Sequence, residues 1–362
     1  MGEGTRRYRT PYPVVVSLLL TMAVFGGQTQ QQQSSTQNKQ TDQKTDSQKQ
    51  PAAGSQTASK PDKPVLTAAP TVAGPNGQQD IQLNALMVNV PITVTDPYGR
   101  FVTGLTQANF EVYEDKVKQE IKLFSDSDAP VSIGIVFDVS GSMKSRINRS
   151  HEALQKFVDA SHEDDDFFLV AFNNYAKVVK DFTTDGHGVA NALTLVEPKG
   201  STALYDAAYI AVEKVRQGRH KRKALIIISD GMDNNSRYTY SELRKIVKEA
   251  DVQIYALGIT DLFGSGAEEQ GGEAILEEIT RMTGGRAFFP TNEVDLEDAI
   301  TRIALELRHQ YSIGYVPQDA GHDGRYRKLR VVVNPPKGMP HLSVRCRDGY
   351  FGQKLGEPVV TR

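Results

Sequence analysis

The chain has 362 residues, 39% of them hydrophobic, and its formal net charge at pH 7 is -2. This length and apolar content are sufficient for one large core and one smaller core, so we expect a main domain and an accessory domain. The nearly balanced charge argues against nucleic acid or an acidic membrane surface as a global partner. The single cysteine, Cys346, excludes an intramolecular disulfide, and its position in a strand-like run is more typical of a small core residue than of a reactive thiol.

Residues 1–27 have the features of a secretory signal. Arginines precede the apolar stretch Val14–Phe25, and Gly26 and Gly27 then lead into polar sequence. This order of basic, apolar and small residues predicts a cleavable signal, and the apolar stretch is short for a membrane span. We therefore expect a secreted or periplasmic protein with no membrane span in the mature chain. An uncleaved inner-membrane anchor is the alternative.

The next segment, residues 28–79, is rich in Gln, Ser, Thr, Lys and Pro and has few large apolar residues. Such a segment cannot bury enough surface to offset its chain entropy, so we expect a disordered linker. It would hold the folded part away from a membrane or wall. At the other end of the chain, we assign residues 353–362 to a tail.

Two flanking segments, residues 80–128 and 308–352, contain short runs that are typical of antiparallel strands. These runs are Leu86–Thr95, Phe110–Tyr113, Ile121–Phe124, Gln310–Tyr315, Tyr326–Val333 and Leu342–Arg345. Neither flank has enough strands to be stable alone. We therefore expect the two flanks to pair into one small β-sandwich with the main domain inserted between them.

The main domain, residues 129–307, alternates apolar strand-like runs with helical patterns. The predicted strands are Val131–Phe137, Phe167–Phe172, Val178–Phe182, Ala224–Ser229, Val252–Gly258 and Ala287–Phe289. The predicted helices are Arg149–Ser161, Val189–Val196, Leu204–Arg216, Tyr240–Ala250, Glu273–Thr283 and Leu296–Leu307. This alternation predicts an α/β fold with a doubly wound, mostly parallel sheet. A short turn joins the second and third strands, so that pair is expected to be antiparallel.

The strongest functional signal begins where the apolar run Val131–Phe137 ends. Asp138, Ser140 and Ser142 follow it at alternating positions. A hard cation such as Mg2+ binds about six oxygens in a nearly octahedral shell at roughly 2.0–2.1 Å. One carboxylate and two hydroxyls can supply part of that shell from a single turn. The pattern therefore predicts a divalent-cation site at the carboxyl end of a strand.

Two later segments are placed to supply further ligands. Asp230 directly follows the predicted strand Ala224–Ser229, and Thr202 lies in the loop before the predicted helix Leu204–Arg216. In an open, mostly parallel sheet, ligands bind outside the carboxyl ends of the strands, where the strand order reverses. We therefore expect three loops to converge on one metal ion.

Five residues resemble the metal-ion-dependent adhesion site of von Willebrand factor type A domains: Asp138, Ser140, Ser142, Thr202 and Asp230. The resemblance implies that the serines and the threonine bind Mg2+ or Mn2+ directly, whereas the aspartates act largely through water or hydrogen bonds. It also implies an open coordination position for an Asp or Glu carboxylate from a protein partner. Movement of the last predicted helix, Leu296–Leu307, would couple binding to the β-sandwich.

The flanks and the main domain together resemble the secreted bacterial proteins that carry the VWFA-related Acidobacterial domain. The resemblance covers about Ile81 to Phe351. Besides the metal motif, it rests on Val94–Asp96 with Gly99–Arg100 and Val102–Leu105, Phe110–Asp115, Ala203–Ala207 and Arg347–Phe351. It implies a fold and a location rather than a specific activity.

Other residues near the motif have a structural interpretation beside the functional one. Short Asp/Ser strings are common in turns, where these side chains bond their own backbone. Asp206 and Asp233 are candidates for supporting the metal ligands through hydrogen bonds. However, Asp206 also suits the first turn of a helix, where a carboxylate interacts well with the helix dipole, and Asp233 can simply shape its loop. The basic run Arg216–Lys223 could hold an anionic polymer, but a solvated loop is favoured. The acidic run Glu163–Asp166 lacks the spacing of a calcium site, and a polar helix-to-strand connection explains it.

The sequence gives less support for an enzymatic function than for binding. A nucleophilic Ser140 or Ser142 needs a base within reach, and none of the seven histidines lies in a motif that would place it there. We therefore predict an exported, non-enzymatic module that captures an acidic residue of a protein partner through a divalent cation. The alternatives are a metal-independent structural or assembly factor of the cell envelope and, less favoured, a metal-dependent hydrolase. The sequence does not indicate an oligomeric state.

Overall fold

The computed structural model describes residues 87–259, 267–318 and 323–352. The predicted signal, linker and tail lie outside these residues, so they remain predictions, as do the boundaries of the predicted domains. None of the helices that the structure describes combines the length and the apolar character that a membrane span requires.

The central feature is a six-stranded sheet with the strand order β10-β9-β8-β5-β6-β7. Its strands are β5 (Val131–Asp138), β6 (Asp166–Phe172), β7 (Ala176–Thr183), β8 (Arg222–Ser229), β9 (Gln253–Gly258) and β10 (Ala287–Phe288). All neighbours are parallel except β6 and β7, which are antiparallel as predicted. The chain moves outward from β5 through β6 and β7, then returns to the other side of β5 for β8. The strand order thus reverses at β5.

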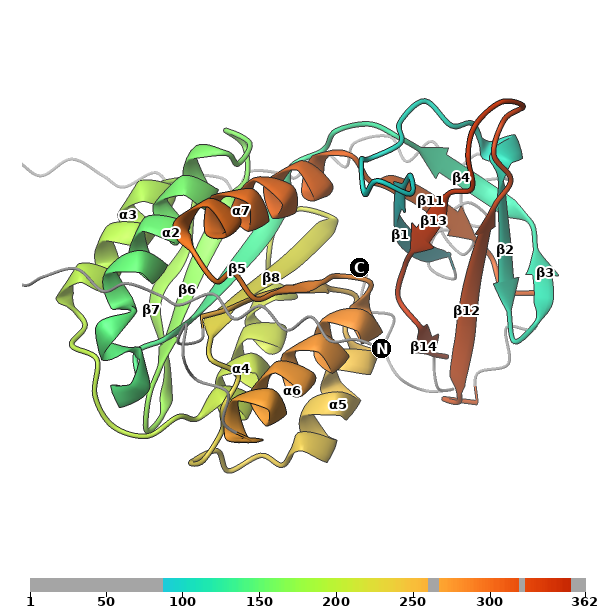
Figure 1. Ribbon diagram of the computed structural model, residues 1–362. Coiled ribbons are helices and arrows are strands. Elements are labelled where there is room, and N and C mark those ends of the chain that lie inside the picture. Colours follow the sequence, from blue (N-terminus) through green and yellow to red (C-terminus); the bar gives the residue numbers. More distant parts are fainter. Residues whose placement is uncertain (1–86, 260–266, 319–322, 353–362) are drawn as a thin grey trace, which may run out of the picture. The chain divides into compact units, whose positions relative to one another are not determined.

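Helices cover both faces of this sheet (Figure 1). They are α2 (Ile147–Asp159), α3 (Gly186–Ala192), α4 (Leu204–Val215), α5 (Tyr240–Glu249), α6 (Ala267–Thr283) and α7 (Glu293–Arg308). Side chains of α2, α3 and α7 pack in one apolar core with β5, and those of α4, α5 and α6 pack in a second core on the opposite face. Every residue of β5 is buried, because both faces of the strand are covered.

Several helices begin at residues that satisfy their free backbone N–H groups. The Thr239 hydroxyl accepts a hydrogen bond from the Glu242 N–H at 3.3 Å, and the Glu242 carboxylate accepts one from the Thr239 N–H at 2.8 Å. This reciprocal pair is a capping box at the start of α5. At the start of α7, the Asn292 side chain accepts a hydrogen bond from the Asp295 N–H at 2.9 Å.

Two four-stranded sheets contain the flanks, with the orders β13-β1-β11-β4 and β14-β12-β2-β3. The strands before the central sheet are β1 (Val88–Thr95), β2 (Phe110–Glu114), β3 (Val117–Gln119) and β4 (Ile121–Ser125). Those after it are β11 (Tyr311–Tyr315), β12 (Tyr326–Val333), β13 (Ser343–Arg345) and β14 (Gly349–Phe351). Side chains from both sheets form one apolar core. The predicted fold class, a doubly wound sheet inserted into a β-sandwich of the two flanks, is confirmed.

The structure differs from the predicted elements in several places. β3 and β14 were not predicted, and the helix expected from Glu273 to Thr283 begins at Ala267 as α6. The hairpin before β3 turns through Asp115 and Lys116, which have φ of 45° and 73° without a glycine to mark the turn. The predicted helix Val189–Val196 divides into α3 and a 3-10 turn over Leu193–Leu195.

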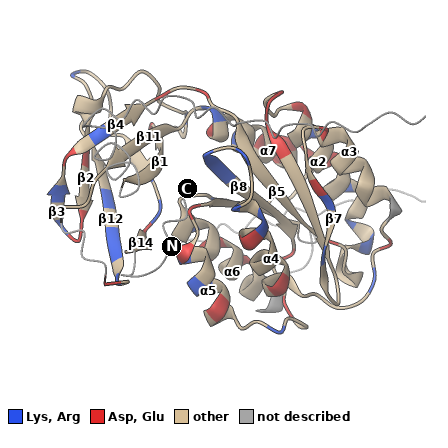
Figure 2. Cartoon of the chain, turned by 180° about the vertical axis from the view of Figure 1, so that it is seen from behind, with Lys and Arg blue, Asp and Glu red and all other residues tan. Residues whose placement is uncertain are grey.

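Charged residues of both signs are interspersed over the described elements, in line with the net charge of -2 (Figure 2). The most basic strand is β12, which carries Arg327, Lys328 and Arg330. Arg327 is buried and its guanidinium donates to the Glu114 carboxylate at 2.9 Å. At least this part of the basic strand therefore serves the packing of the β-sandwich.

Candidate metal centre

Asp138 is the last residue of β5, and its side chain is fully buried. Its Oδ1 accepts a hydrogen bond from the Ser140 N–H at 2.9 Å, and its Oδ2 accepts one from the Ser229 hydroxyl at 2.6 Å. Phe137 pairs with Ile228 in the parallel register, so Asp138 and Ser229 come next to each other at the ends of adjacent strands. The carboxylate is therefore fixed from both strands.

The two serines of the motif lie close together. Ser140 Oγ and Ser142 Oγ are 3.0 Å apart; Ser140 is buried, whereas Ser142 is exposed. Two adjacent ligands of an octahedral cation, each at roughly 2.0–2.1 Å from it, are separated by about 2.9 Å. The spacing of these hydroxyls therefore fits a shared Mg2+ or Mn2+.

The loop that carries Thr202 is bonded to the serine loop through the backbone. The Gly141 N–H donates to the Gly200 carbonyl at 3.0 Å, and the Lys199 N–H donates to the Val139 carbonyl at 2.9 Å. Gly200 has a φ of +86°, and a Cβ there would lie 2.2 Å from the Asn174 side chain. Only glycine fits this close approach. Thr202 follows this turn two residues after Gly200, and it is buried, with 4% of its surface exposed.

Asp230 follows β8, and its loop is bonded to the Thr202 loop. The Thr202 carbonyl accepts hydrogen bonds from the Asn234 and Asn235 N–H groups, both at 3.0 Å. The Asp230 Oδ1 accepts from the Met232 N–H at 3.2 Å, and its Oδ2 lies 3.4 Å from Nη1 of Arg146. All three predicted loops are therefore held together by hydrogen bonds at one edge of the sheet.

The electrostatics of this cluster are unfavourable for the ionised Asp138 carboxylate. Burial raises the pKa of Asp138 to about 6, and the Asp230 charge adds to the rise, while hydrogen bonds from Ser229 and Ser140 oppose it. A buried carboxylate beside a second carboxylate favours the binding of a positive ion or a proton. With two carboxylates and neutral hydroxyls, the donor set has the all-oxygen chemistry that Mg2+ and Mn2+ prefer.

Asp206 and Asp233 fasten the loop after Asp230 to the start of α4. Asp206 Oδ1 accepts hydrogen bonds from the Arg237 and Tyr238 N–H groups at 2.9 and 3.0 Å. Asp233 Oδ2 accepts from the Tyr205 N–H at 3.0 Å and from the Ser236 hydroxyl at 2.5 Å. Both carboxylates thus shape the loop, which was the structural interpretation of Asp233; for Asp206, which lies in the first turn of α4, these loop contacts were not predicted. Their support of the metal ligands through this loop stays a prediction.

Three contributors to the cluster were not predicted: Ser229, Arg146 and Asn234. Ser229 is adjacent to Asp230, and the parallel pairing of two strands that both end in a polar residue was the signal that could have identified it. The Asn234 side chain accepts a hydrogen bond from the Thr202 N–H at 2.8 Å. Arg146 is buried and nearby Lys144 is exposed, and both closely follow the serine motif. Nothing in the sequence indicates which of these two basic side chains is buried.

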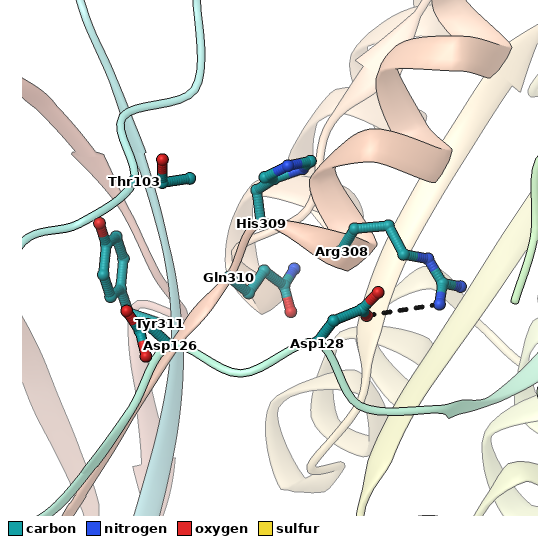
Figure 3. A pocket seen from close by; sticks show the side chains of 7 residues that line it. All are labelled: Thr103, Asp126, Asp128, Arg308, His309, Gln310 and Tyr311. Atoms are coloured by element: carbon teal, nitrogen blue, oxygen red, sulfur yellow. Dashed lines mark hydrogen bonds and ion pairs between the residues drawn. The ribbon is translucent and has the colours of Figure 1, made fainter.

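The described residues contain no cluster of three or more His, Cys, Asp or Glu side chains placed to hold a metal ion. The candidate centre differs from such clusters because three of its five side chains are hydroxyls. A cavity of about 280 Å3 lies elsewhere, near the end of α7 (Figure 3), and its lining residues are Thr103, Asp126, Asp128, Arg308, His309, Gln310 and Tyr311. Two of the charged residues in its lining pair with each other, since Arg308 contacts Asp128 at 3.5 Å, and Arg308 also contacts Asp165 at 2.5 Å.

The basic and acidic runs also have structural partners. In the basic run, the Arg219 guanidinium donates to the Asp164 carbonyl at 2.8 Å. In the acidic run, Asp165 is fully buried and its Oδ1 accepts from the Val131 N–H at 2.8 Å, which anchors the start of β5. Asp165 therefore satisfies backbone donors inside the fold, in the polar connection between α2 and β6.

Comparisons with known proteins identify the central segment. Residues 133–232 match the family model described as von Willebrand factor type A domain. No curated protein matches the chain.

Among solved structures, the conserved hypothetical protein BatB from Bacteroides thetaiotaomicron is 20% identical, with 49% of this chain and 98% of that chain covered and a TM-score of 0.41. A von Willebrand factor type A protein from Catenulispora acidiphila is 13% identical, with 70% and 76% covered and a TM-score of 0.44. The vWF domain of the type V pili tip protein Mfa5 from Porphyromonas gingivalis is 22% identical, with 29% and 39% covered and a TM-score of 0.28.

The matched segment contains the whole candidate metal centre, from Asp138 to Asp230. It also contains the part of the sheet where the strand order reverses, between β6, β5 and β8. Residues 133–232 of this chain therefore belong to the von Willebrand factor type A domain family.

Proposed function

We propose that this protein is an exported, non-enzymatic binding module that captures an Asp or Glu side chain of a protein partner. Its divalent cation, Mg2+ or Mn2+, would be held by Asp138, Ser140, Ser142, Thr202 and Asp230. When bound, the cation supplies a positive, electrophilic position for the partner's carboxylate. The observation that carries the proposal is the 3.0 Å spacing of the Ser140 and Ser142 hydroxyls beside two buried aspartates.

The residues of the centre have distinct tasks in this proposal. Asp138 fixes the Ser140 backbone through its 2.9 Å hydrogen bond and thereby orients the serine turn. The serine and threonine hydroxyls are uncharged ligands. They therefore do not neutralise the charge of the cation, which remains available for an anionic partner. Because Ser142 is exposed and Asp138 is buried, the partner would approach from the Ser142 side.

Hydrolysis is less well supported than binding. A metal-assisted hydrolase needs a group that takes a proton from water near the ion. The histidine contacts that the structure describes involve other parts of the chain, such as His151 with the Ala190 carbonyl and His309 with the Leu305 carbonyl. The two aspartates of the centre already accept hydrogen bonds that fix the loops.

A metal-independent structural or assembly role in the envelope is the second candidate, and one observation favours it. Arg146 places its guanidinium 3.4 Å from the Asp230 carboxylate, so part of the negative charge is balanced by the chain itself. In this case the centre would stabilise the loops without a metal ion.

Calorimetric titration of Mg2+ and Mn2+ separates these functions. The protein without residues 1–27 is compared with the Asp138→Ala and Ser142→Ala variants, and with Ser145→Ala as a control. Ser145 is an exposed serine in the same 3-10 turn, Gly141–Ser145, but it is outside the predicted ligand set. Saturable binding in the wild type and Ser145→Ala, lost in the other two, supports the proposal.

The other outcomes point to the alternatives. Absence of metal binding in all variants would favour the metal-independent role. Metal-dependent turnover of model esters or phosphates would favour the hydrolase. Once binding is established, partner capture is tested with Mn2+ and with EDTA, and the proposal requires that EDTA abolish it.

A further inference from the structure

The turn between β6 and β7, residues 173–175, begins at the same edge of the sheet as the candidate metal centre. Phe172, the last residue of β6, is aligned with Asp138 at the end of β5. Its carbonyl accepts a hydrogen bond from the Val139 N–H at 2.8 Å. The turn therefore leaves the sheet next to the point where the serine motif leaves it.

This turn is bonded to the loop that carries Thr202. The Asn174 side-chain oxygen accepts a hydrogen bond from the Ser201 N–H at 2.5 Å, and the Asn173 carbonyl accepts one from the Ala203 N–H at 2.9 Å. Ser201 and Ala203 are the two neighbours of Thr202 in the chain. The turn is thus fastened on both sides of a predicted metal ligand.

The same turn is bonded to the loop after Asp230. The Asn174 carbonyl accepts a hydrogen bond from the Asn235 side-chain amide at 2.6 Å. Because its contacts reach both loops, the backbone of the turn has a fixed position beside the centre. A side chain on such a backbone is presented to a partner with little loss of conformational entropy on binding.

Tyr175 is the large side chain of this turn, and it is 62% exposed. Its backbone carbonyl accepts a hydrogen bond from the Asn173 N–H at 3.3 Å. Its side chain has no hydrogen bond or ring contact with the residues that the structure describes. Single exposed apolar residues are ordinary on protein surfaces. Tyr175 differs from them because its backbone is fixed beside a candidate binding centre.

The exposed charges of the neighbouring segments complement an acidic partner. Lys144 in the serine turn and Lys177 at the start of β7 are exposed, and neither forms an ion pair within the described ranges. In the loop before Thr202, Glu197 is balanced by Lys199 at 3.1 Å. These charges favour the approach of a segment that carries carboxylates over that of a basic segment.

We propose that Tyr175 determines which partner is captured, by packing against an apolar side chain at a fixed spacing from the partner's Asp or Glu. This inference rests on the proposed function. A cation binds any accessible carboxylate, so the metal ion alone does not distinguish one acidic partner from another. A tyrosine ring supplies a large contact area at low entropic cost, and tyrosine is enriched among the residues that dominate binding energy at interfaces.

The test selects binders from a phage-displayed library of random heptapeptides in Mn2+, with selection in EDTA as the reference. The proteins are the wild type, Tyr175→Ser, Tyr175→Phe and Tyr98→Ser. Tyr98 is the matched control, because it is an 80% exposed tyrosine in the N-terminal flank. Circular dichroism establishes that each variant is folded. Calorimetric titration establishes its Mn2+ affinity, which should not change because neither tyrosine is a predicted ligand.

The wild type, Tyr175→Phe and Tyr98→Ser are expected to enrich peptides with an Asp or Glu and an apolar residue at one constant spacing. Tyr175→Ser should still enrich Asp or Glu but lose the apolar preference. A synthetic peptide from the wild-type selection should bind Tyr175→Ser roughly tenfold more weakly in fluorescence anisotropy. Tyr175→Phe keeps the ring, so its affinity should remain within about threefold of the wild type.

An apolar preference that is absent in the wild type, or that persists in Tyr175→Ser, would overturn the inference and leave metal-dependent capture of carboxylates intact. Failure of every protein to enrich Asp or Glu in Mn2+ would instead overturn the proposed function together with the inference.

If Tyr175→Ser does not fold, 19F NMR of the wild type labelled with 3-fluorotyrosine decides. Tyr175→Phe and Tyr98→Phe assign the two signals. The selected peptide should shift the signal of Tyr175 and leave that of Tyr98 in place. An unchanged Tyr175 signal on saturation with the peptide contradicts the contact.

Discussion

Asp138 lies where the apolar strand β5 ends and a polar loop begins. The hydroxyl of one serine on the adjacent strand β8 donates a hydrogen bond to its carboxylate. The Ser229 hydroxyl donates to Asp138 Oδ2 at 2.6 Å, and both residues are fully buried. Ser142, by contrast, is exposed. One serine should therefore matter for stability and the other for metal binding.

Ser229→Ala removes a hydrogen bond to a buried carboxylate, so the free energy of unfolding should fall by about 1–3 kcal/mol. Ser142→Ala should leave the stability within about 0.5 kcal/mol of the wild type, because its hydroxyl is exposed. Urea unfolding in EDTA measures both. Ser142→Ala is nevertheless expected to lose Mn2+ binding, and equal losses of stability in the two variants would contradict this division of roles.

The raised pKa of Asp138 predicts a pH dependence of the metal-free protein. Its pKa rises from 3.8 to about 6 in the fold because of burial. Between these values the folded state binds more protons than the unfolded state, so this residue's stabilising contribution is complete below pH 3.8 and is lost as the pH rises through about 6.

The size of this effect should be on the order of 1–3 kcal/mol. Urea unfolding in EDTA at a series of pH values measures it, with Asp138→Asn as the reference, since the amide does not titrate. As the pH increases from 4 to 7, the free energy of unfolding of the wild type should fall relative to that of Asp138→Asn. A difference that is constant over this range would show that Asp138 does not titrate in it.

The five predicted metal ligands were accessible to sequence reasoning because each follows a strand or precedes a helix in a recognisable pattern. The hydrogen bonds that join their loops were less accessible. The side chains of Arg146 and Asn234 point into the centre. Their directions depend on the fold of the 3-10 turn Gly141–Ser145 and of the loop after Asp230. Spacing along the chain does not reveal whether a basic side chain near the motif is buried, as Arg146 is, or exposed, as Lys144 is.

At the scale of the elements, α7 is attached to the β-sandwich by one buried carboxylate. Glu306 Oε1 accepts hydrogen bonds from the Tyr255 hydroxyl at 2.9 Å and from the Thr93 hydroxyl at 3.1 Å, and it forms an ion pair with Arg345. These partners belong to β9, β1 and β13. The position of α7 is thus linked to both the central sheet and the flanks.

Replacement of Glu306 by Gln should destabilise the protein by about 2–4 kcal/mol, because Arg345 loses the charge that compensates its partly buried guanidinium. Glu297→Gln is the matched control on the same helix. Glu297 pairs with Lys156 at the surface, where their side chains are 56% and 49% exposed, so its replacement should cost no more than about 0.5 kcal/mol. Urea unfolding of both variants checks this, and similar costs would refute the anchoring role.

The strands and helices of the central domain were predicted from two kinds of hydrophobic pattern, continuous apolar runs and amphipathic stretches. Apolar runs such as Val131–Phe137 mark strands that are buried on both faces, and the helices between them are amphipathic. β3 and β14 escaped prediction because they have only three residues each and gain their order from pairing with β2 and β12. Their existence depends on tertiary contacts rather than on a local pattern.

At the scale of the whole described region, the last segment of the chain joins the β-sandwich to the central domain. Arg347 donates to the Asp251 carboxylate at 2.9 Å and to the Asn89 carbonyl at 2.8 Å, and the Asp348 N–H donates to the Met282 carbonyl at 3.2 Å. β1 also pairs with both β11 and β13. Because the flanks close only around the inserted domain, unfolding of one part should remove contacts that stabilise the other.

We therefore expect the β-sandwich and the central domain to unfold in one cooperative transition, and two independent probes can test this. The α-helices of the described region lie between residues 147 and 308, so far-UV circular dichroism follows mainly the central domain. Cys346 is the single cysteine and packs against the sandwich core, and burial raises its pKa to about 11. Its reaction with a thiol reagent therefore reports opening of the flanks.

The two probes should give the same urea midpoint in the wild type and in Arg330→Gln, which replaces an exposed arginine of β12. Arg347→Gln removes the contact with Asp251, which crosses from the flank to the central domain, so the Cys346 thiol of this variant should react at a lower urea concentration than that at which the helices are lost. If the thiol of the wild type already reacts well before the helical signal falls, the flanks form a separate folding unit and the contacts of Arg347 do not couple the two parts.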